Sequence, residues 1–248
     1  MRDDEIAICG LSAVRARFRR SPASINRLFF DLPTSRKVGI ICRAMAAAQK
    51  PYRCVEPAEL EKISGSVHHG GIVAVAQQAP VREPKADDLA SWHRRRESMV
   101  VLDRIGNSHN LGAIARSAAF FGVPRIVISG EAGAARPGPA AFRVAEGGLD
   151  SVEVWRVPAA APFLRLLSAA GFEVVGAATR GGKAAAGSRG PWALVLGNEE
   201  EGLSAEAATA CTRLVTLRGS NLVESLNVSA AAAVLIHDLS SRPARSDK

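Results

Sequence analysis

The sequence has 248 residues, of which 47% are hydrophobic, so the chain is long enough to bury one large core or two smaller ones. The formal net charge of +8 is compatible with a polyanionic partner, but charge alone does not identify one. The four cysteines lack the spacing of a zinc site, and no apolar run is long enough to cross a bilayer. The start, Met1–Glu5, is too acidic for a secretory signal, so we expect a soluble cytoplasmic protein with reduced thiols, no membrane segment and no metal.

The hydrophobic pattern of residues 6–78 predicts a small α/β unit. Leu11, Val14 and Phe18 recur at helical spacing, and two glycines precede the apolar run Ile72–Ala76. The expected helices are Leu11–Arg20, Lys37–Gln49 and Pro57–Ile63, and the expected strands are Ile25–Phe30, Tyr52–Val55 and Ile72–Ala76.

The first expected helix carries four arginines on the side away from its apolar face, namely Arg15, Arg17, Arg19 and Arg20. Guanidinium groups attract nucleic-acid phosphates, so these residues are candidates for RNA contacts. A solvated basic helix face is an equally good interpretation of any one of them. The next stretch, 81–98, contains proline, mixed charges and Arg94–Arg96, and it is typical of a linker that ends near a short helix at Leu89–Trp92.

From Met99 onward, strand and helix patterns alternate, which predicts a parallel sheet covered by helices on both faces. The expected strands are Met99–Leu102, Arg125–Ile128, Val152–Val157, Glu173–Ala177, Trp192–Leu196 and Leu214–Leu217. The expected helices are Leu111–Phe121, Pro139–Glu146, Phe163–Ala170, Ala205–Ala210 and Leu226–Leu239. Ligands of such sheets bind beyond the carboxyl ends of the strands, where Gly197 and Leu217 stand.

The loop before the last expected helix ends in the polar residue Ser225. We predict that Ser225 is the N-cap of this helix, because its hydroxyl can accept a hydrogen bond from a backbone N–H one turn ahead. The first strand-to-helix turn of this half has no G-x-G-x-x-G pattern, so a dinucleotide-binding fold lacks its main support.

Three stretches, in this order, resemble the motifs of one family. They are Asn110 with Arg116, then Gly197–Glu199 with Gly202 and Leu203, then Ser225–Val228. Together they resemble the SpoU (TrmH-like) family of RNA 2′-O-ribose methyltransferases in the SPOUT superfamily. The resemblance implies an L30e-like substrate-binding domain at 1–80, a linker at 81–98, a SPOUT domain with a parallel sheet and a trefoil knot at 99–242, and a tail at 243–248.

The resemblance also implies an activity, a cofactor and partners. The chain is expected to transfer a methyl group from S-adenosylmethionine to a ribose 2′-hydroxyl of rRNA or tRNA, as a homodimer joined through the knotted domains. The implied catalytic residues are Asn110, Arg116, Glu199 and Asn227. The implied cofactor-binding residues are Thr179, Leu196, Gly197, Asn198, Leu217, Ser225, Leu226 and Asn227, and Arg116 joins the four arginines of the first helix as an RNA contact.

The role of Arg116 has two interpretations. A guanidinium has a pKa above ~12 and is hard to deprotonate, which favours a clamp on the RNA phosphate that also stabilises alkoxide charge. A role as the base stays open. Two other classes of protein compete with the methyltransferase: a catalytically inactive RNA-binding or ribosome-assembly protein on the same fold, and an unrelated nucleotide-binding α/β enzyme.

Overall fold

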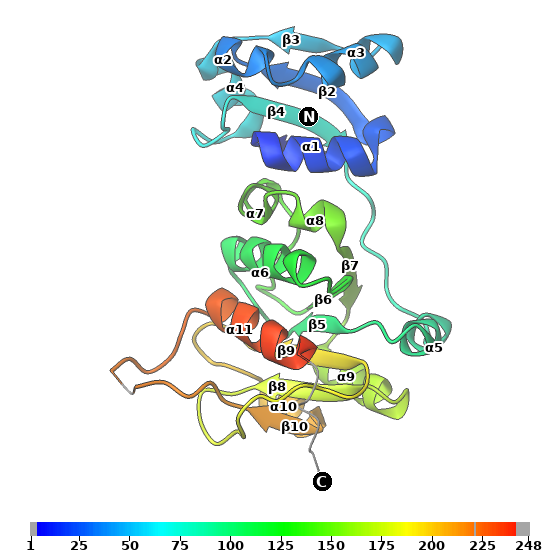
Figure 1. Cartoon of the computed structure of the whole chain (residues 1–248), viewed down its shortest axis with the longest axis vertical. Coiled ribbons are helices and arrows are strands. Elements are labelled where there is room, and N and C mark those ends of the chain that lie inside the picture. Colours follow the sequence, from blue (N-terminus) through cyan, green and yellow to red (C-terminus); the bar gives the residue numbers. More distant parts are fainter. Residues whose placement is uncertain (1–3, 221, 242–248) are drawn as a thin grey trace.

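The computed structural model describes residues 4–220 and 222–241, and its two β-sheets follow one another along the chain (Figure 1). The expected tail at 243–248 lies outside the described residues. In the described part, no helix has the length and apolar character needed to cross a bilayer. Residues 4–220 and 222–241 also contain no group of three or more His, Cys, Asp or Glu side chains arranged to hold a metal ion.

The first sheet has the order β1-β4-β2-β3, with β1 (Glu5–Cys9) and β2 (Ile25–Phe30) antiparallel to β4 (Ile72–Gln77), and β3 (Tyr52–Cys54) parallel to β2. Its helices are α1 (Leu11–Arg20), α2 (Leu32–Ser35), α3 (Gly39–Ala47) and α4 (Pro57–Ser64). The predicted elements of this half are therefore confirmed to within a few residues, whereas β1 and α2 were not predicted.

The second sheet is parallel throughout, which confirms the predicted α/β class. Its order is β10-β8-β9-β5-β6-β7. The strands are β5 (Met99–Leu102), β6 (Arg125–Ser129), β7 (Glu153–Val157), β8 (Glu173–Ala177), β9 (Trp192–Leu196) and β10 (Arg213–Val215). The helices are α6 (Ser108–Phe120), α7 (Pro139–Ala145), α8 (Gly148–Ser151), α9 (Ala160–Ala169), α10 (Ala205–Ala210) and α11 (Val228–Ser240).

Alternate residues of these strands point into two separate cores. Val100, Leu102 and Ile126 pack with α6, α7 and α11, whereas Val101 and Val127 pack with α9 and α10 on the other face. Buried parallel strands require apolar residues on both faces, which explains their continuous hydrophobic runs.

The stretch expected to be a linker with a short helix is packed against the second core. Its helix α5 (Ala86–Arg94, Figure 1) is longer than predicted, and its residues Leu89 and Trp92 are buried. The ring of Trp92 lies 5.1 Å from that of Trp155, and the guanidinium of Arg125 lies 4.5 Å above Trp92. Aromatic pairs and cation–π contacts of this kind fix a segment in place. Composition alone missed this packing because the anchoring residues lie far along the chain.

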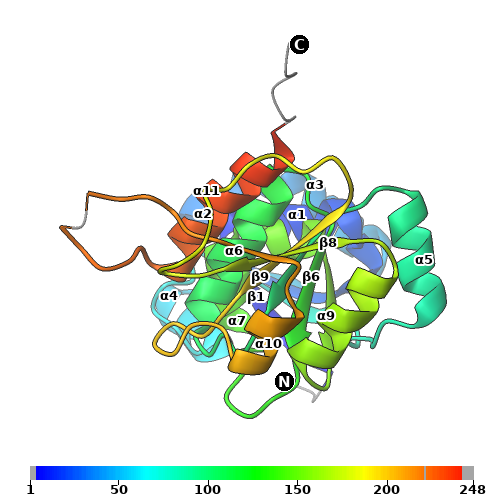
Figure 2. The ribbon, with the colours of Figure 1, turned by 90° about the horizontal axis from the view of Figure 1, so that it is seen from below.

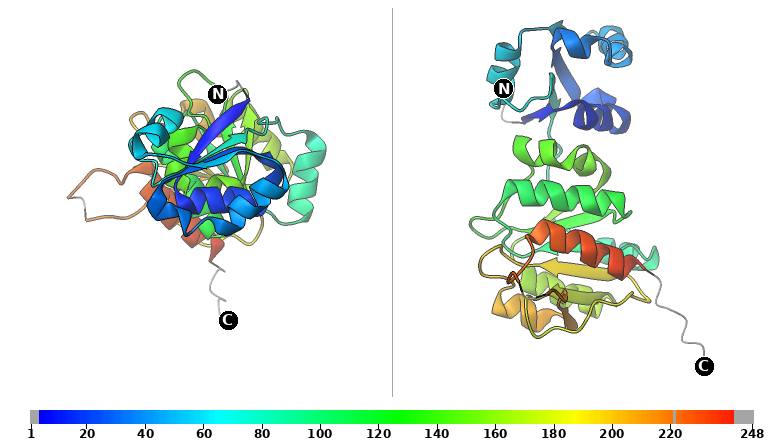
Figure 3. Two further views of the ribbon diagram at one scale, coloured as in Figure 1. Left: turned by 90° about the horizontal axis from the view of Figure 1, so that it is seen from above. Right: turned by 60° about the vertical axis from the view of Figure 1, so that its left-hand side comes forward.

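The two sheets are joined through helices of both halves (Figure 3). Helix α1 lies against α8, and a Cβ on Gly147 would come within 2.5 Å of the Cβ of Ala16. The ion pair between Arg17 and Asp150 crosses this contact with an N–O distance of 2.5 Å. Strand β1 also packs on α7, so one hydrophobic core extends from the first sheet to the second.

Candidate active site

The three polar motifs meet at the carboxyl edge of the second sheet. The Asn110 side-chain amide donates to the Glu199 carboxylate over 2.7 Å, and the Asn110 side-chain oxygen accepts from the Asn227 amide over 3.1 Å. Asn110 is almost fully buried, so its donor and acceptor must be satisfied inside the protein. The amide of Asn110 thus links residues that are 89 and 117 positions away in the sequence.

Glu199 holds the loop that leads into α6. Its two oxygens accept from the backbone N–H groups of Gly106 and Asn107, each at 3.2 Å, as well as from Asn110. Burial raises the pKa of this carboxyl, but these hydrogen bonds lower it by more, so the pKa lies below its ordinary value. Glu199 therefore stays ionised at neutral pH and acts as a fixed acceptor.

Two further side chains complete this edge of the sheet. Asp103, which is 1% exposed, accepts from the backbone N–H of Ser204, the N-cap of α10. The Asn198 amide donates to the carbonyl of Arg104, whose backbone is left-handed with φ of 59°. Asn198 also accepts from the N–H groups of the two residues after Glu199, so its side chain is used within the protein. The sequence singled out neither Asp103 nor Ser204, although a serine before an alanine-rich helix is a usual N-cap.

The backbone around Gly197 leaves no room for a side chain. A Cβ at this position would lie 2.2 Å from the carbonyl carbon of Gly202 and from the nitrogen of Leu203. The space beside Gly197 is thus filled by the backbone of its own turn, in which Gly202 donates to the Asn198 carbonyl. The absence of a Cβ at Gly197 therefore permits this tight turn.

The prediction that Ser225 caps the last helix is wrong. Helix α11 begins at Val228 and its N-cap is Asn227, whose side-chain oxygen accepts from the Ser229 N–H over 2.8 Å. Asn227 satisfies the capping preference equally well, and its amide nitrogen reaches Asn110 at the same time. Ser225 instead lies exposed in the preceding loop.

The loop between β10 and α11 projects from the body of the molecule (Figure 2). Leu226 is 52% exposed and Leu222 is 89% exposed, and Arg180 forms an ion pair with Glu224 over 3.0 Å. The remaining expected cofactor residues lie at strand ends: Leu196 is buried, Leu217 is half-buried and Thr179 is exposed. They surround the edge of β8, β9 and β10, and the loop with Ser225 and Leu226 extends away from it.

Arg116 lies on α6 but outside the Asn110 network. Arg116 lies six positions after Asn110, so the two side chains point in directions that differ by about 240° around the helix axis. Its exposed guanidinium forms an ion pair with Glu146, with an N–O distance of 2.9 Å. The Asn110 side chain contacts Glu199 and Asn227 and does not contact Arg116. No pattern in the sequence pointed to Glu146.

Of the four arginines of α1, three are exposed and one is not. Arg15, Arg19 and Arg20 point to solvent as expected, whereas Arg17 is buried against Asp150 and over the ring of Phe142. Arg17 also donates to the carbonyl of Gln77. Arg17 is thus a contact between the two halves of the chain, which corrects its placement among the RNA contacts. Glu201 is exposed and forms an ion pair with Arg104 over 2.5 Å.

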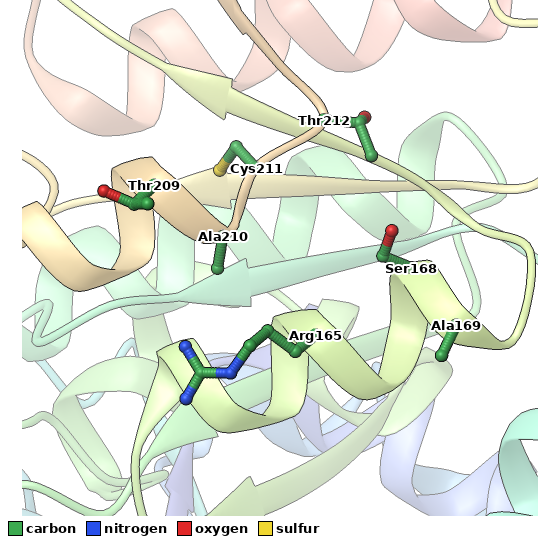
Figure 4. A pocket seen from close by; sticks show the side chains of 7 residues that line it. All are labelled: Arg165, Ser168, Ala169, Thr209, Ala210, Cys211 and Thr212. Atoms are coloured by element: carbon green, nitrogen blue, oxygen red, sulfur yellow. The ribbon is translucent and has the colours of Figure 1, made fainter.

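A hollow of about 520 Å³ is lined by residues of α9 and α10 and by the two residues after α10, and none of the Asn110 network lines it (Figure 4). Arg165 and Cys211 are among its lining residues. Burial, with a smaller effect of the Asp103 charge, raises the pKa of the Cys211 thiol to about 12. A thiol with such a pKa stays protonated and unreactive at neutral pH.

A parallel α/β domain with three polar motifs joined at its carboxyl edge is the architecture of a class of RNA-modifying enzymes, and comparisons with known proteins agree. Residues 97–237 match the SpoU rRNA Methylase family, and residues 7–81 match the family described as RNA 2′-O ribose methyltransferase substrate binding. The chain belongs to the SpoU rRNA methylase family, which confirms the resemblance seen in its motifs.

Two relatives agree with this family, and one solved structure shares the fold. It is 32% identical over 240 residues to the uncharacterized tRNA/rRNA methyltransferase YfiF of Escherichia coli O157:H7, covering 95% of this chain and 68% of that protein. It is 30% identical to the 23S rRNA (guanosine-2′-O-)-methyltransferase RlmB of Nitrosomonas europaea, covering 93% and 89%. The fold matches the SpoU methyltransferase AviRb of Streptomyces viridochromogenes in complex with AdoMet, with a TM-score of 0.71, 23% identity and coverage of 95% and 89%. The AviRb structure contains AdoMet, which is the cofactor that the motif resemblance implies.

Proposed function

We propose that this chain transfers the methyl group of S-adenosylmethionine to a ribose 2′-hydroxyl of structured RNA, either rRNA or tRNA. The observation that carries the proposal is the Glu199–Asn110–Asn227 network, which joins all three motifs at the sheet edge where ligands of parallel α/β folds bind. The 2′-O specificity is also supported by the name of the RlmB relative and by that of the substrate-binding family.

The residues that we assign to an adenosyl cofactor lie at the ends of β8, β9 and β10 and in the loop that extends away from them. The loop between β10 and α11 combines a hydroxyl at Ser225 with the apolar side chains of Leu222 and Leu226, which stay largely exposed. An adenosine ring covers apolar surface and takes hydrogen bonds from backbone and hydroxyl groups. Leu196, Gly197, Asn198 and Leu217 would then line its floor, with Thr179 at the side. Bound there, S-adenosylmethionine supplies an already activated methyl group.

The protein must align the ribose and help remove the hydroxyl proton. Alignment contributes several kcal/mol to such reactions, and stabilisation of developing charge contributes more. Arg116 is the residue we assign to the RNA: its exposed guanidinium contacts the phosphate beside the target ribose and stabilises the forming alkoxide. The proton leaves to water or to the phosphate, because a guanidinium does not give up its own proton readily.

RNA binding is assigned to residues 1–80 together with Arg116. Arg15, Arg19 and Arg20 are exposed on α1, which packs on the α7–α8 turn next to Arg116. Family membership further supports an L30e-like fold for this half and a trefoil knot for the SPOUT domain, 99–242. It also supports a cytoplasmic homodimer joined through those domains. The exposed Phe120 of α6 and Val234 of α11, two helices in contact, would be covered in such a dimer.

The test is a methyl-transfer assay with tritiated S-adenosylmethionine, using rRNA and tRNA from a strain that lacks the protein. We expect incorporation by the wild-type protein, loss of at least 100-fold in Arg116→Ala, and unchanged cofactor affinity of Arg116→Ala by calorimetry. Binding of RNA without cofactor binding or methyl transfer would instead identify an inactive RNA-binding protein of this fold. Equal loss of cofactor affinity in Arg116→Ala would make the residue structural.

A further inference from the structure

The guanidinium of Arg116 is held by a single carboxylate. One of its terminal nitrogens lies 2.9 Å from an oxygen of Glu146, and the two side chains are 57% and 50% exposed. In residues 4–220 and 222–241, Arg116 has no other ion-pair or hydrogen-bond partner for its side chain. A guanidinium has five N–H donors arranged as a planar fork, so one bound nitrogen leaves the rest of the fork free for a ligand.

Glu146 makes this contact from an unfavourable backbone conformation. It is the C-cap of α7 and its φ is 45°, in the left-handed region that disfavours residues with a Cβ. Helix α4 ends in the same conformation but uses Gly65, with φ of 69°. This conformation costs free energy for a residue with a Cβ, and within the described residues the Glu146 side chain forms its one ion pair with Arg116.

The turn that carries Glu146 is pressed against both α6 and α1. A Cβ on Gly148 would lie 2.8 Å from the Cα of Arg116, and a Cβ on Gly147 would lie 2.5 Å from the Cβ of Ala16. The buried ion pair of Arg17 with Asp150 fixes α8 to α1 one turn further on. The backbone of Glu146 is thus fixed relative to the helix of Arg116 and to the helix that carries the exposed arginines.

We propose that Glu146 is a positioning residue for Arg116, a role that rests on the methyl transfer proposed above. The carboxylate holds one terminal nitrogen and so fixes the plane of the guanidinium before RNA arrives. The free edge of the fork then faces the RNA phosphate or the 2′-oxygen without a further loss of side-chain freedom. Glu146 itself touches neither RNA nor cofactor.

The experiment measures kcat, the KM for RNA and cofactor affinity in Glu146→Gln and Glu146→Gly, with the exposed Glu206→Gln as a matched loss of one negative charge. We expect kcat to fall about 10-fold or more in both Glu146 variants, because loss of orientation acts on the transition state. The KM for RNA changes by less than about 3-fold, and cofactor affinity is unchanged. Glycine removes the backbone strain, so the Tm of Glu146→Gly equals or exceeds that of the wild type, which separates lost activity from lost folding. Glu206→Gln keeps the wild-type kcat.

Three results would overturn the inference. If kcat in both Glu146 variants stays within 2-fold of the wild type while Arg116→Ala is inactive, the inference fails and the proposed function stands. If KM for RNA rises at constant kcat, Glu146 shapes the RNA surface and does not orient Arg116. If the wild-type protein transfers no methyl group to total rRNA or tRNA, the proposed function fails and the inference fails with it.

Discussion

The buried ion pair of Arg17 and Asp150 gives the sharpest stability prediction. The two side chains are 10% and 3% exposed, and the pair joins the first half of the chain to α8. Removal of Asp150 in Asp150→Ala leaves the Arg17 charge buried with only the Gln77 carbonyl, the distant Ser24 hydroxyl and the Phe142 ring as partners. A buried charge that loses its partner destabilises a protein by about 3–5 kcal/mol. Because Arg17 keeps these other contacts, we expect Asp150→Ala to be destabilised by the lower value of this range, about 3 kcal/mol.

The intact pair itself is worth much less than this cost. Burial raises the pKa of Asp150 by more than the nearby Arg17 lowers it, and one oxygen of Asp150 has no hydrogen-bond donor within the described residues. Burial of the Asp150 carboxylate therefore carries a large desolvation penalty, and the attraction to Arg17 offsets only part of it. The double variant Arg17→Met, Asp150→Ala removes both charges, and we expect it to lie within about 1 kcal/mol of the wild type.

Urea denaturation of the wild type, both single variants and the double variant measures these values as a double-mutant cycle. A coupling energy of about 2 kcal/mol or more is expected between the two positions. The reasoning is refuted if Asp150→Ala loses less than 1 kcal/mol, or if the double variant is as unstable as Asp150→Ala. The first result would mean that Arg17 finds water or another partner when Asp150 is absent. The second would mean that the instability of Asp150→Ala does not come from an unpaired Arg17 charge.

Three further predictions concern the sheet edge. Gly197→Ala should lower the free energy of unfolding by about 1–3 kcal/mol and abolish cofactor binding, because the added Cβ meets backbone that cannot rotate away. Thermal unfolding measures the first effect and calorimetry the second, and an unchanged Tm would contradict this prediction. Asn110→Ala should cost about 1–3 kcal/mol and most of the methyl transfer, because it leaves Glu199 and Asn227 without their shared partner, and retention of full activity would show that the network is dispensable. Glu199→Gln should give a pH-dependent difference from the wild type: a lowered folded pKa stabilises the wild type above the ordinary carboxyl pKa of about 4.3, and that advantage is lost as pH falls through the lowered value. A difference between the two proteins that is constant from pH 7 to pH 3 would contradict this assignment.

Sequence patterns predicted most of the fold, because the hydrophobic pattern within most segments agrees with the helix or strand that the segment forms. The alternation from Met99 onward gave every strand of the parallel sheet, since strands buried on both faces read as continuous apolar runs. Strand β1 was missed because its charged start, including Glu5, masks its period, and Glu5 turns out to be paired with Arg27. Packing of α5 was missed because it depends on Trp155 and Arg125, residues that no local window contains.

The site was predictable to the extent that a motif specifies contacts within itself. The motifs predicted that Asn110, Glu199 and Asn227 act together, and the hydrogen bonds join them. The sequence could not tell which partner each of these side chains contacts. A glutamate such as Glu199, which accepts from three N–H groups of the protein, has the same sequence pattern as one that faces a ligand. The burial of Arg17 was hidden for a similar reason: its partner Asp150 lies 133 residues away.

The geometry of α6 separates two tasks that the family motif places together. Asn110, on the buried side, fixes the loops at the sheet edge through Glu199 and Asn227, whereas Arg116, about 240° further round the helix, faces solvent beside Glu146. A change at Asn110 should therefore act first on cofactor affinity, and a change at Arg116 or Glu146 should act first on kcat with cofactor affinity intact. Measuring both quantities in Asn110→Ala and Glu146→Gln tests this separation directly. Parallel losses of affinity and kcat in both variants would mean that the two faces of α6 move as one unit.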